Sequence, residues 1–275
     1  MATTEIVGIG CHGARGDGNG PAARFLATRP RDFTRGLFKF RSTGGGADSL
    51  PSDQDLFITV THGLWGTAMP PWYKISAEER LAVIQYLKTF STRWREEPVN
   101  APIDIPAESP VTTASIEAGR ADFMKICFTC HGESGRGDGP LAGTLTDSWG
   151  HDIRPADFTR PAGVPGGVKL GHDGTHIFKT VMTGVGGTPM PAFAGTFTPA
   201  EVWDIAHYVQ SLRVDAHLAE MRDAGLAATR EAEAEARRFV WAGLSQAAAD
   251  GRIEAAVLAG PGAAGQMALN TRVRR

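Results

Sequence analysis

The chain has 275 residues, of which 42% are hydrophobic and 21% are charged. This length and composition predict a globular protein with enough apolar material for two small cores. A formal net charge of -2 gives no electrostatic reason to expect a nucleic acid or an anionic membrane as partner, and no apolar run is long enough to predict a membrane span. The 34 glycines and 17 prolines predict turn-rich loops between short helices.

The first part of the chain, residues 1–95, carries three short motifs and then a predicted helix. Ser76 and Glu79 have the spacing of a capping box, so we expect that helix to begin near residue 77. The motifs are Cys-His-Gly at residues 11–13, Arg-Pro-Arg-Asp-Phe-Thr-Arg at 29–35 and Gly-Thr-Ala-Met-Pro at 66–70.

Residues 96–112 differ in composition from what precedes and follows them. They contain four prolines and show no helical period. Proline fixes the backbone in an extended conformation and cannot continue a helix. We therefore predict a semi-extended linker between two domains.

A further predicted helix, over residues 115–126, leads into Cys127-Phe128-Thr129-Cys130-His131. Two thiols three positions apart can each add across a vinyl group of one haem, and the histidine that follows can then bind the iron. This spacing indicates a covalent haem site with His131 as an axial ligand. Met190, in a methionine-proline loop further along the chain, is the candidate for the opposite face.

Three other interpretations of the paired cysteines are less well supported. Structural zinc needs four ligands, usually two such pairs, and Cys11 is the one other cysteine in the chain. A thioredoxin-like dithiol would precede a helix, whereas a glycine-rich loop over residues 132–139 follows here. Two purely structural cysteines would leave the adjacent histidine and the methionine loop as coincidences. Haem is the interpretation that uses all of these residues.

The rest of the chain continues with loops and then helices. Thr198 and Glu201 form a second capping-box pattern, which predicts a helix from residue 199 to about 213. Residues 214–250 are rich in alanine, glutamate and arginine and predict one or two more helices. From residue 260 onward, glycine, alanine and arginine predict a frayed tail.

The motifs of the first part recur in the same order in the second. Arg-Pro-Ala-Asp-Phe-Thr-Arg at residues 154–160 matches 29–35, and Gly-Thr-Pro-Met-Pro at 187–191 matches 66–70. Cys-His-Gly also recurs, at residues 130–132. Three motifs in register at nearly constant spacing predict two homologous modules.

The first module differs at its front end. Gly8 occupies the position that corresponds to Cys127, so one of the two thioether positions is missing. Residues 1–10 have neither the basic start nor the apolar stretch of a signal peptide. We therefore expect a truncated or mis-started chain, with a divergent first module as the alternative.

Both modules resemble the cytochrome c domain, and the chain resembles a tandem diheme c-type cytochrome. The resemblance covers residues 1–95 and 113–213, and it implies an all-α fold. Residues 214–275 lie outside it, and their composition predicts a helical extension and a flexible tail. It implies thioether attachment at Cys127 and Cys130 and axial ligation by His131 and Met190 in the second module. In the first module, the matching residues are Cys11, His12 and Met69.

The resemblance also implies residues that support the haem. In this family a proline carbonyl accepts the proton of the proximal imidazole, and Pro140 and Pro21 each follow their histidine by nine positions. Arg154 and Arg29, in the repeated Arg-Pro pair, are candidates for contact with haem propionates, although an exposed arginine is the commoner outcome in a loop.

The expected function is electron transfer through haem c, one in the second domain and another in the first, between redox protein partners in the periplasm. Iron held by histidine and methionine has no free position for a substrate, so we expect a carrier rather than an enzyme. Two alternatives remain: a single-haem carrier whose first domain serves for docking, and a diheme peroxidase-like enzyme. Histidines that could replace a methionine ligand are His62, His151, His172, His176, His207 and His217.

Overall fold

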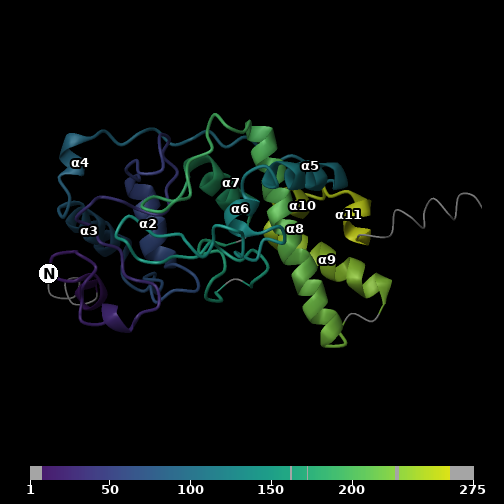
Figure 1. Ribbon diagram of the computed structural model, residues 1–275, viewed down its shortest axis with the longest axis horizontal. Coiled ribbons are helices and arrows are strands. Elements are labelled where there is room, and N and C mark those ends of the chain that lie inside the picture. Colours follow the sequence, from purple (N-terminus) through teal and green to yellow (C-terminus); the bar gives the residue numbers. More distant parts are fainter. Residues whose placement is uncertain (1–7, 162, 172, 227–228, 261–275) are drawn as a thin grey trace, which may run out of the picture.

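The computed structural model describes residues 8–161, 163–171, 173–226 and 229–260. Over these residues the chain is built from helices and long loops, with isolated β-bridges and no sheet (Figure 1). The all-α prediction is confirmed. The elements are η1 (Ala23–Phe25), α2 (Asp53–His62), α3 (Ala77–Lys88), α4 (Arg93–Glu96), α5 (Thr113–Phe123), α6 (Phe128–His131), α7 (Gly174–Thr183), α8 (Pro199–Asp223), α9 (Arg230–Leu244), α10 (Gln246–Ala249) and α11 (Ala255–Ala259).

Three hydrophobic cores follow one another along the molecule. In Figure 1, α2 to α4 lie at one end, α6 to α8 in the middle, and α9 to α11 toward the other end. The first core contains Leu56 and Ile84, from α2 and α3. The second is centred on Phe178 and Val202, from α7 and α8, and the third on Trp241 of α9.

The predicted capping boxes start helices at the expected places. Ser76 accepts a hydrogen bond from the backbone N–H of Glu79, and α3 begins at Ala77. Thr198 does the same for Glu201, and α8 begins at Pro199, where proline's missing N–H costs no helical hydrogen bond. The helix predicted over 115–126 is α5, shifted to residues 113–123 by the cap at Thr112.

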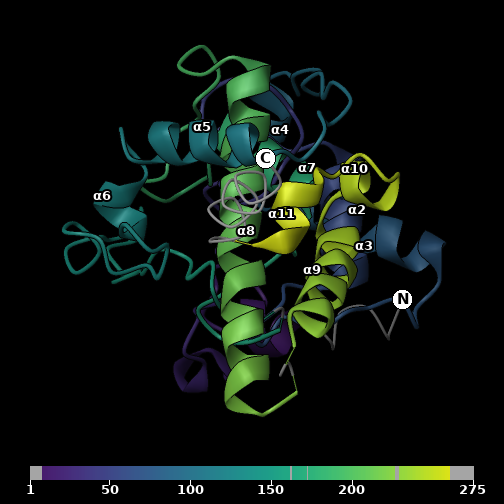
Figure 2. The same ribbon diagram turned by 90° about the vertical axis from the view of Figure 1, so that its right-hand side faces the viewer.

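The helix α8 is longer than the pattern predicted. The predicted end near residue 213 lies inside α8, which continues to Asp223. Its first half packs against α5 so closely that a Cβ on Gly119 would lie 1.8 Å from the carbonyl oxygen of Asp204. Its second half lies beside α9 (Figure 2). Val214 and Leu218 of this half are buried in the third core with Trp241. The second module and the extension therefore share one helix.

The segment 96–112 is extended after α4, as predicted, but it is tied down along its length. The N–H of Ile103 donates to Ser42 of the first module at 2.7 Å. The carbonyl of Pro106 accepts from Trp203 of α8 at 3.1 Å, and the N–H of Val111 donates to Arg252 of the extension at 2.9 Å. This segment connects all three parts of the molecule.

Candidate functional site

The Cys-x-x-Cys-His motif forms a short helix. Cys127 is the N-cap of α6, and its carbonyl accepts from the N–H of His131 at 2.9 Å. Both Cys127 and Cys130 are free thiols. Burial raises the pKa of the Cys127 thiol to about 11, so this sulfur is neutral at physiological pH. An apolar setting of this kind suits a thioether better than a zinc thiolate.

The ring of His131 is held by two contacts. Its Nδ1 lies 3.1 Å from the carbonyl oxygen of Ala156, and the ring stacks on Phe158 with 4.5 Å between centroids. Because a carbonyl can only accept, Nδ1 carries the proton and Nε2 keeps its lone pair. Burial lowers the pKa of the imidazole, which favours this neutral form. The arrangement provides a metal ligand with a fixed tautomer.

The acceptor of the imidazole proton differs from the prediction for Pro140. The glycine-rich loop after α6 folds back onto the motif itself, where Gly137 and Gly139 donate to the carbonyls of His131 and Cys130 at 2.8 and 3.1 Å. A Cβ on Gly139 would lie 2.4 Å from the carbonyl oxygen of Phe128, so this close return requires glycine. Pro140 comes directly after this turn of the loop. The carbonyl that accepts from the imidazole of His131 belongs to Ala156 instead.

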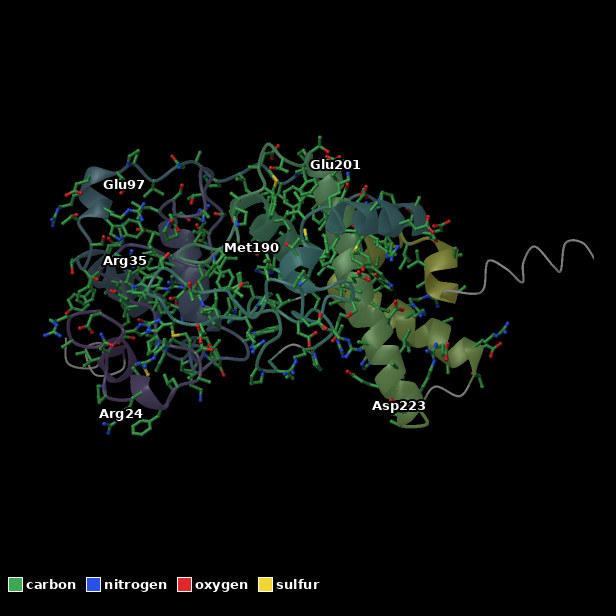
Figure 3. The ribbon with its side chains drawn as sticks, in the orientation of Figure 1. Arg24, Arg35, Glu97, Met190, Glu201 and Asp223 are labelled. Carbon is green, nitrogen blue, oxygen red and sulfur yellow. The ribbon has the colours of Figure 1, made fainter. Side chains whose placement is uncertain are left out.

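Met190 lies at the end of a tight loop that follows α7. The loop begins at Gly184, whose φ of 71° suits glycine, and it closes where the N–H of Val185 donates to the carbonyl of Met190 at 3.1 Å. Thr188 braces it from inside by donating its hydroxyl to Val185 at 2.7 Å. Met190, labelled in Figure 3, packs on the second core. Cys127 packs on the same core.

The first module repeats this geometry. Nδ1 of His12 lies 2.9 Å from the carbonyl oxygen of Arg31, and the ring stacks on Phe33 with 4.5 Å between centroids. Arg31 and Phe33 correspond in sequence to Ala156 and Phe158. Here too the acceptor is not the predicted proline, Pro21. Burial again lowers the pKa of the imidazole.

The methionine loop is repeated as well. The N–H of Leu64 donates to the carbonyl of Met69 at 3.0 Å, and the hydroxyl of Thr67 donates to Leu64 at 2.7 Å. The preceding Gly63 has a φ of 66°. Residues 8–12 are helical, with Gly8 exposed and Cys11 partly exposed. The first module therefore keeps the histidine and methionine environments and lacks one cysteine.

These residues fit a haem. Each module offers a neutral imidazole with a free Nε2 and a methionine thioether, and the second adds two thiols at the attachment spacing. Within the described ranges, no cluster of three or more histidine, cysteine or acidic side chains could hold a metal ion. The zinc interpretation thus finds no four-ligand set in that part of the chain.

The alternative histidine ligands have other environments. His151 lies 3.5 Å from Asp147, and His176 is paired with Asp173. His217 contacts Arg213 and Glu220, and His62 is exposed at the end of α2. His172 lies outside the described residues. Arg29 and Arg154, the predicted propionate contacts, are both exposed.

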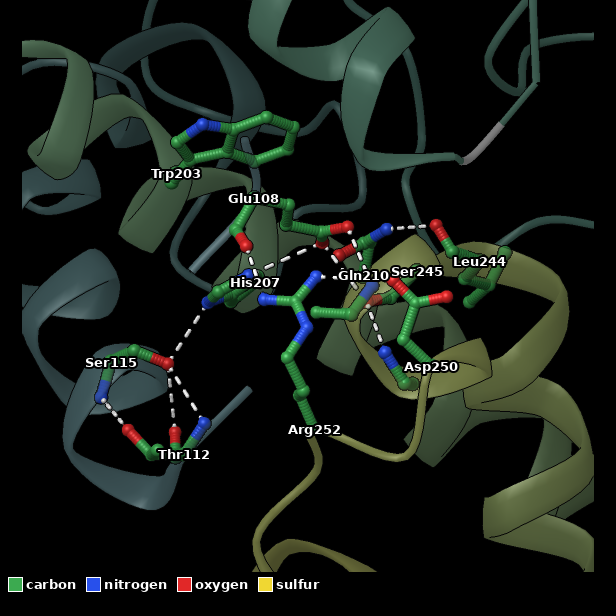
Figure 4. Close-up of polar contacts among 12 residues, drawn as sticks. Glu108, Thr112, Ser115, Trp203, His207, Gln210, Leu244, Ser245, Asp250 and Arg252 are labelled. Atoms are coloured by element: carbon green, nitrogen blue, oxygen red, sulfur yellow. Dashed lines mark hydrogen bonds and ion pairs between the residues drawn. The ribbon is translucent and has the colours of Figure 1, made fainter. Parts of the chain in front are cut away.

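A polar network surrounds the remaining candidate, His207, which is completely buried (Figure 4). Its Nδ1 lies 2.9 Å from Oγ of Ser115, and its Nε2 lies 3.3 Å from Glu108. The order serine, histidine, carboxylate also occurs in hydrolases, but a catalytic imidazole must reach substrate. His207 has no exposed surface, so its imidazole cannot reach a substrate. The network instead connects α5, α8 and the segment 96–112.

The contact between the modules was not predicted. The indole N–H of Trp149 donates to Asp32 at 2.8 Å, and the guanidinium of Arg31 lies 4.4 Å above the same indole. Two backbone hydrogen bonds also cross, from Trp65 to the carbonyl of Lys169 and from Gly186 to that of Lys39. The segments that make these backbone contacts are themselves repeated in the sequence. Phe-Lys-Phe at 38–40 and Val-Lys-Leu at 168–170 both follow the Asp-Phe-Thr motif.

Comparisons with known proteins agree with this site. The family model for cytochrome c matches residues 116–213. A chain of the reducing HAO-like protein complex of Kuenenia stuttgartiensis is similar in structure, with a TM-score of 0.70 and 37% sequence identity; the match covers 75% of this chain and 91% of that one. No curated protein matches. None of the described helices is long and apolar enough to cross a bilayer. The chain therefore contains a cytochrome c domain over residues 116–213.

Proposed function

We propose that this cytochrome carries electrons through two covalently bound haems, one in each module. In the second module, Cys127 and Cys130 attach the haem, and His131 and Met190 bind its iron. In the first, the corresponding residues are Cys11, His12 and Met69. Bound in this way, haem exchanges one electron at a time and offers no open position to a substrate.

The observation that carries the proposal is the repetition of the histidine site. Each ring has the same pair of contacts, a carbonyl at Nδ1 and a stacked phenylalanine at 4.5 Å. A docking domain that had lost its haem would have no need to keep Nε2 free or to keep the methionine loop. The repeated geometry therefore favours haem in both modules over the single-haem alternative.

The surrounding residues hold the ligands in position. Carbonyls of Ala156 and Arg31 fix the imidazole tautomers, and the hydroxyls of Thr188 and Thr67 brace the methionine loops. Rigid ligands need little rearrangement when the charge on the iron changes. This rigidity is what an electron carrier requires, whereas a peroxidase-like enzyme would need a labile sixth ligand.

The partners would be redox proteins, and the location would be the periplasm, where cysteines of bacterial c-type cytochromes are joined to haem. The similar chain from Kuenenia stuttgartiensis is part of a reducing HAO-like protein complex. That similarity supports a role for this chain as a cytochrome subunit that exchanges electrons within a redox complex.

Haem content tests the proposal. We would express the protein in the periplasm of a host that matures c-type cytochromes, then measure intact mass and the pyridine haemochrome spectrum. Two haem adducts per chain are expected. A single adduct, on the peptide that contains Cys127 and Cys130, would replace the proposal with the docking alternative. No adduct would overturn the assignment of haem c.

A further inference from the structure

The two modules meet along a contact with approximate two-fold symmetry, which we call the seam and define by Lys39, Trp65, Lys169 and Gly186. The N–H of Trp65 donates to the carbonyl of Lys169 at 2.9 Å, and the N–H of Gly186 donates to the carbonyl of Lys39 at 3.3 Å. Trp65 and Gly186 occupy corresponding positions in the two methionine loops. Each lysine therefore lies beside the methionine loop of the other module.

The seam is close-packed on both sides. A Cβ on Gly186 would lie 2.1 Å from the carbonyl oxygen of Phe38, and a Cβ on Gly66 would lie 2.5 Å from that of Val164. Loops that approach this closely need glycine. The two lysines are consequently held between the two haem sites.

Neither Lys39 nor Lys169 makes an ion pair or a side-chain hydrogen bond with any of the described residues. Burial lowers the pKa of Lys39 to about 7, and the charges of Arg31 and Lys169 add to this effect, while Asp147 opposes it. Burial also lowers the pKa of Lys169. Two partly buried cations of like charge are unfavourable unless an anion lies near them.

We propose that Lys39 and Lys169 bind haem propionate carboxylates at the seam, so that the electrostatic state of each haem depends on a residue placed between the modules. This inference rests on the proposed function. Propionates are the anions that haem would bring to this place, and they would give the two lysines direct ion-pair partners. The exposed Arg29 and Arg154 do not share this placement.

The consequence concerns the reduction potential. A lysine cation disfavours the ferric state, which carries one more positive charge than the ferrous state. Removing it would lower the midpoint potential and leave a propionate without its partner. The pKa of that propionate would then rise, because the lost cation no longer favours its charged form, and the potential would come to depend on pH.

The test uses holoprotein whose haem content has first been verified by mass, so that a missing haem counts against the proposed function alone. Spectroelectrochemical titrations would compare the natural protein with K39M and K169M. The control is K74M, which removes an exposed lysine. We expect K39M and K169M to lower a midpoint potential relative to K74M and to make it pH-dependent. Potentials that match K74M at every pH would overturn the inference.

Two further measurements test alternative explanations. The first distinguishes the loss of the lysine charge from a change in packing, and the second distinguishes a propionate from a free anion as the partner of the lysines. K39R and K169R keep the cation, so they should restore the natural potential. A shift that persists in the arginine variants would show a packing effect and overturn the inference. If the lysines instead bind a free anion, inorganic phosphate at constant ionic strength would change the potential of the natural protein, and we expect no such change.

Discussion

Phe158 lies stacked against the imidazole of His131, with ring centroids 4.5 Å apart and 20° between the planes. The same phenylalanine meets Phe123 of α5 edge to face at 6.3 Å, so the ring connects the Cys-x-x-Cys-His motif to the helix before it. Stacking fixes the rotation of the imidazole, while the carbonyl of Ala156 fixes its tautomer. Orientation of the ligand thus depends on residues far from the motif in sequence.

Replacing Phe158 by alanine should loosen the ligand and destabilise the module. Loss of a large, partly buried ring costs about 3 kcal/mol of unfolding free energy. Urea denaturation followed by far-UV circular dichroism would measure the loss. F33A should have a comparable effect on the first module, because its ring occupies the same place against His12. Equal stability of F158A and the natural protein would contradict the bracing role.

If Met190 binds the iron as proposed, replacing it by alanine should open the sixth position of the haem in the second module and lower its potential, since the thioether favours the reduced state. The change would be read from the visible spectrum and from potentiometry. M124A is a matched control, because Met124 is also partly buried against the same core but lies at the end of α5. A spectrum unchanged in M190A, or changed equally in M124A, would rule Met190 out as the ligand.

The sequence was sufficient to predict the parts of the fold that depend on local signals. Capping boxes at Ser76 and Thr198 placed the starts of α3 and α8 correctly, because a cap acts within one helical turn. The repeated motifs predicted two modules, and the geometry around His12 and His131 agrees with that repetition.

Features set by contacts distant in sequence could not be predicted in this way. The acceptor for His131 is Ala156, and nothing in the spacing of the motif indicates which loop will pass that ring. The end of α8 depends on Trp241, which arrives from another helix and buries the turns after residue 213. Nothing near Lys39 or Lys169 in the sequence indicates that their carbonyls accept hydrogen bonds from the methionine loop of the other module.

The buried Glu108 should make stability depend on pH. Burial alone would raise the pKa of this carboxyl, but hydrogen bonds from His207, the N–H of Ala247 and the hydroxyl of Ser245 outweigh it and lower the pKa. A carboxyl whose pKa is lower in the folded state stabilises the fold above its unfolded pKa. That contribution is lost as pH falls through the folded pKa.

The carboxylate of Glu108 has several buried partners. It accepts from the hydroxyl of Ser245 at 2.9 Å and from the N–H of Ala247 at 3.0 Å, and it lies 3.3 Å from Nε2 of His207. E108Q would remove the charge and one of the two carboxylate oxygens, so these hydrogen bonds would weaken at a cost of about 2 kcal/mol. Urea titrations at neutral and acidic pH should show this loss at neutral pH and a smaller one in acid, whereas E78Q, on the exposed face of α3, should show neither.

Two buried tryptophans provide a final comparison, because they differ in whether the indole N–H has a partner. Trp203 and Trp241 are 3% and 1% exposed. The N–H of Trp203 donates to Pro106 at 3.1 Å, whereas that of Trp241 has no acceptor among the described residues. Phenylalanine keeps most of the ring and removes the N–H. W203F should therefore cost about 1 kcal/mol more than W241F, since it leaves the carbonyl of Pro106 unpaired, and equal losses in urea titrations would count against the anchoring of the segment 96–112 by Trp203.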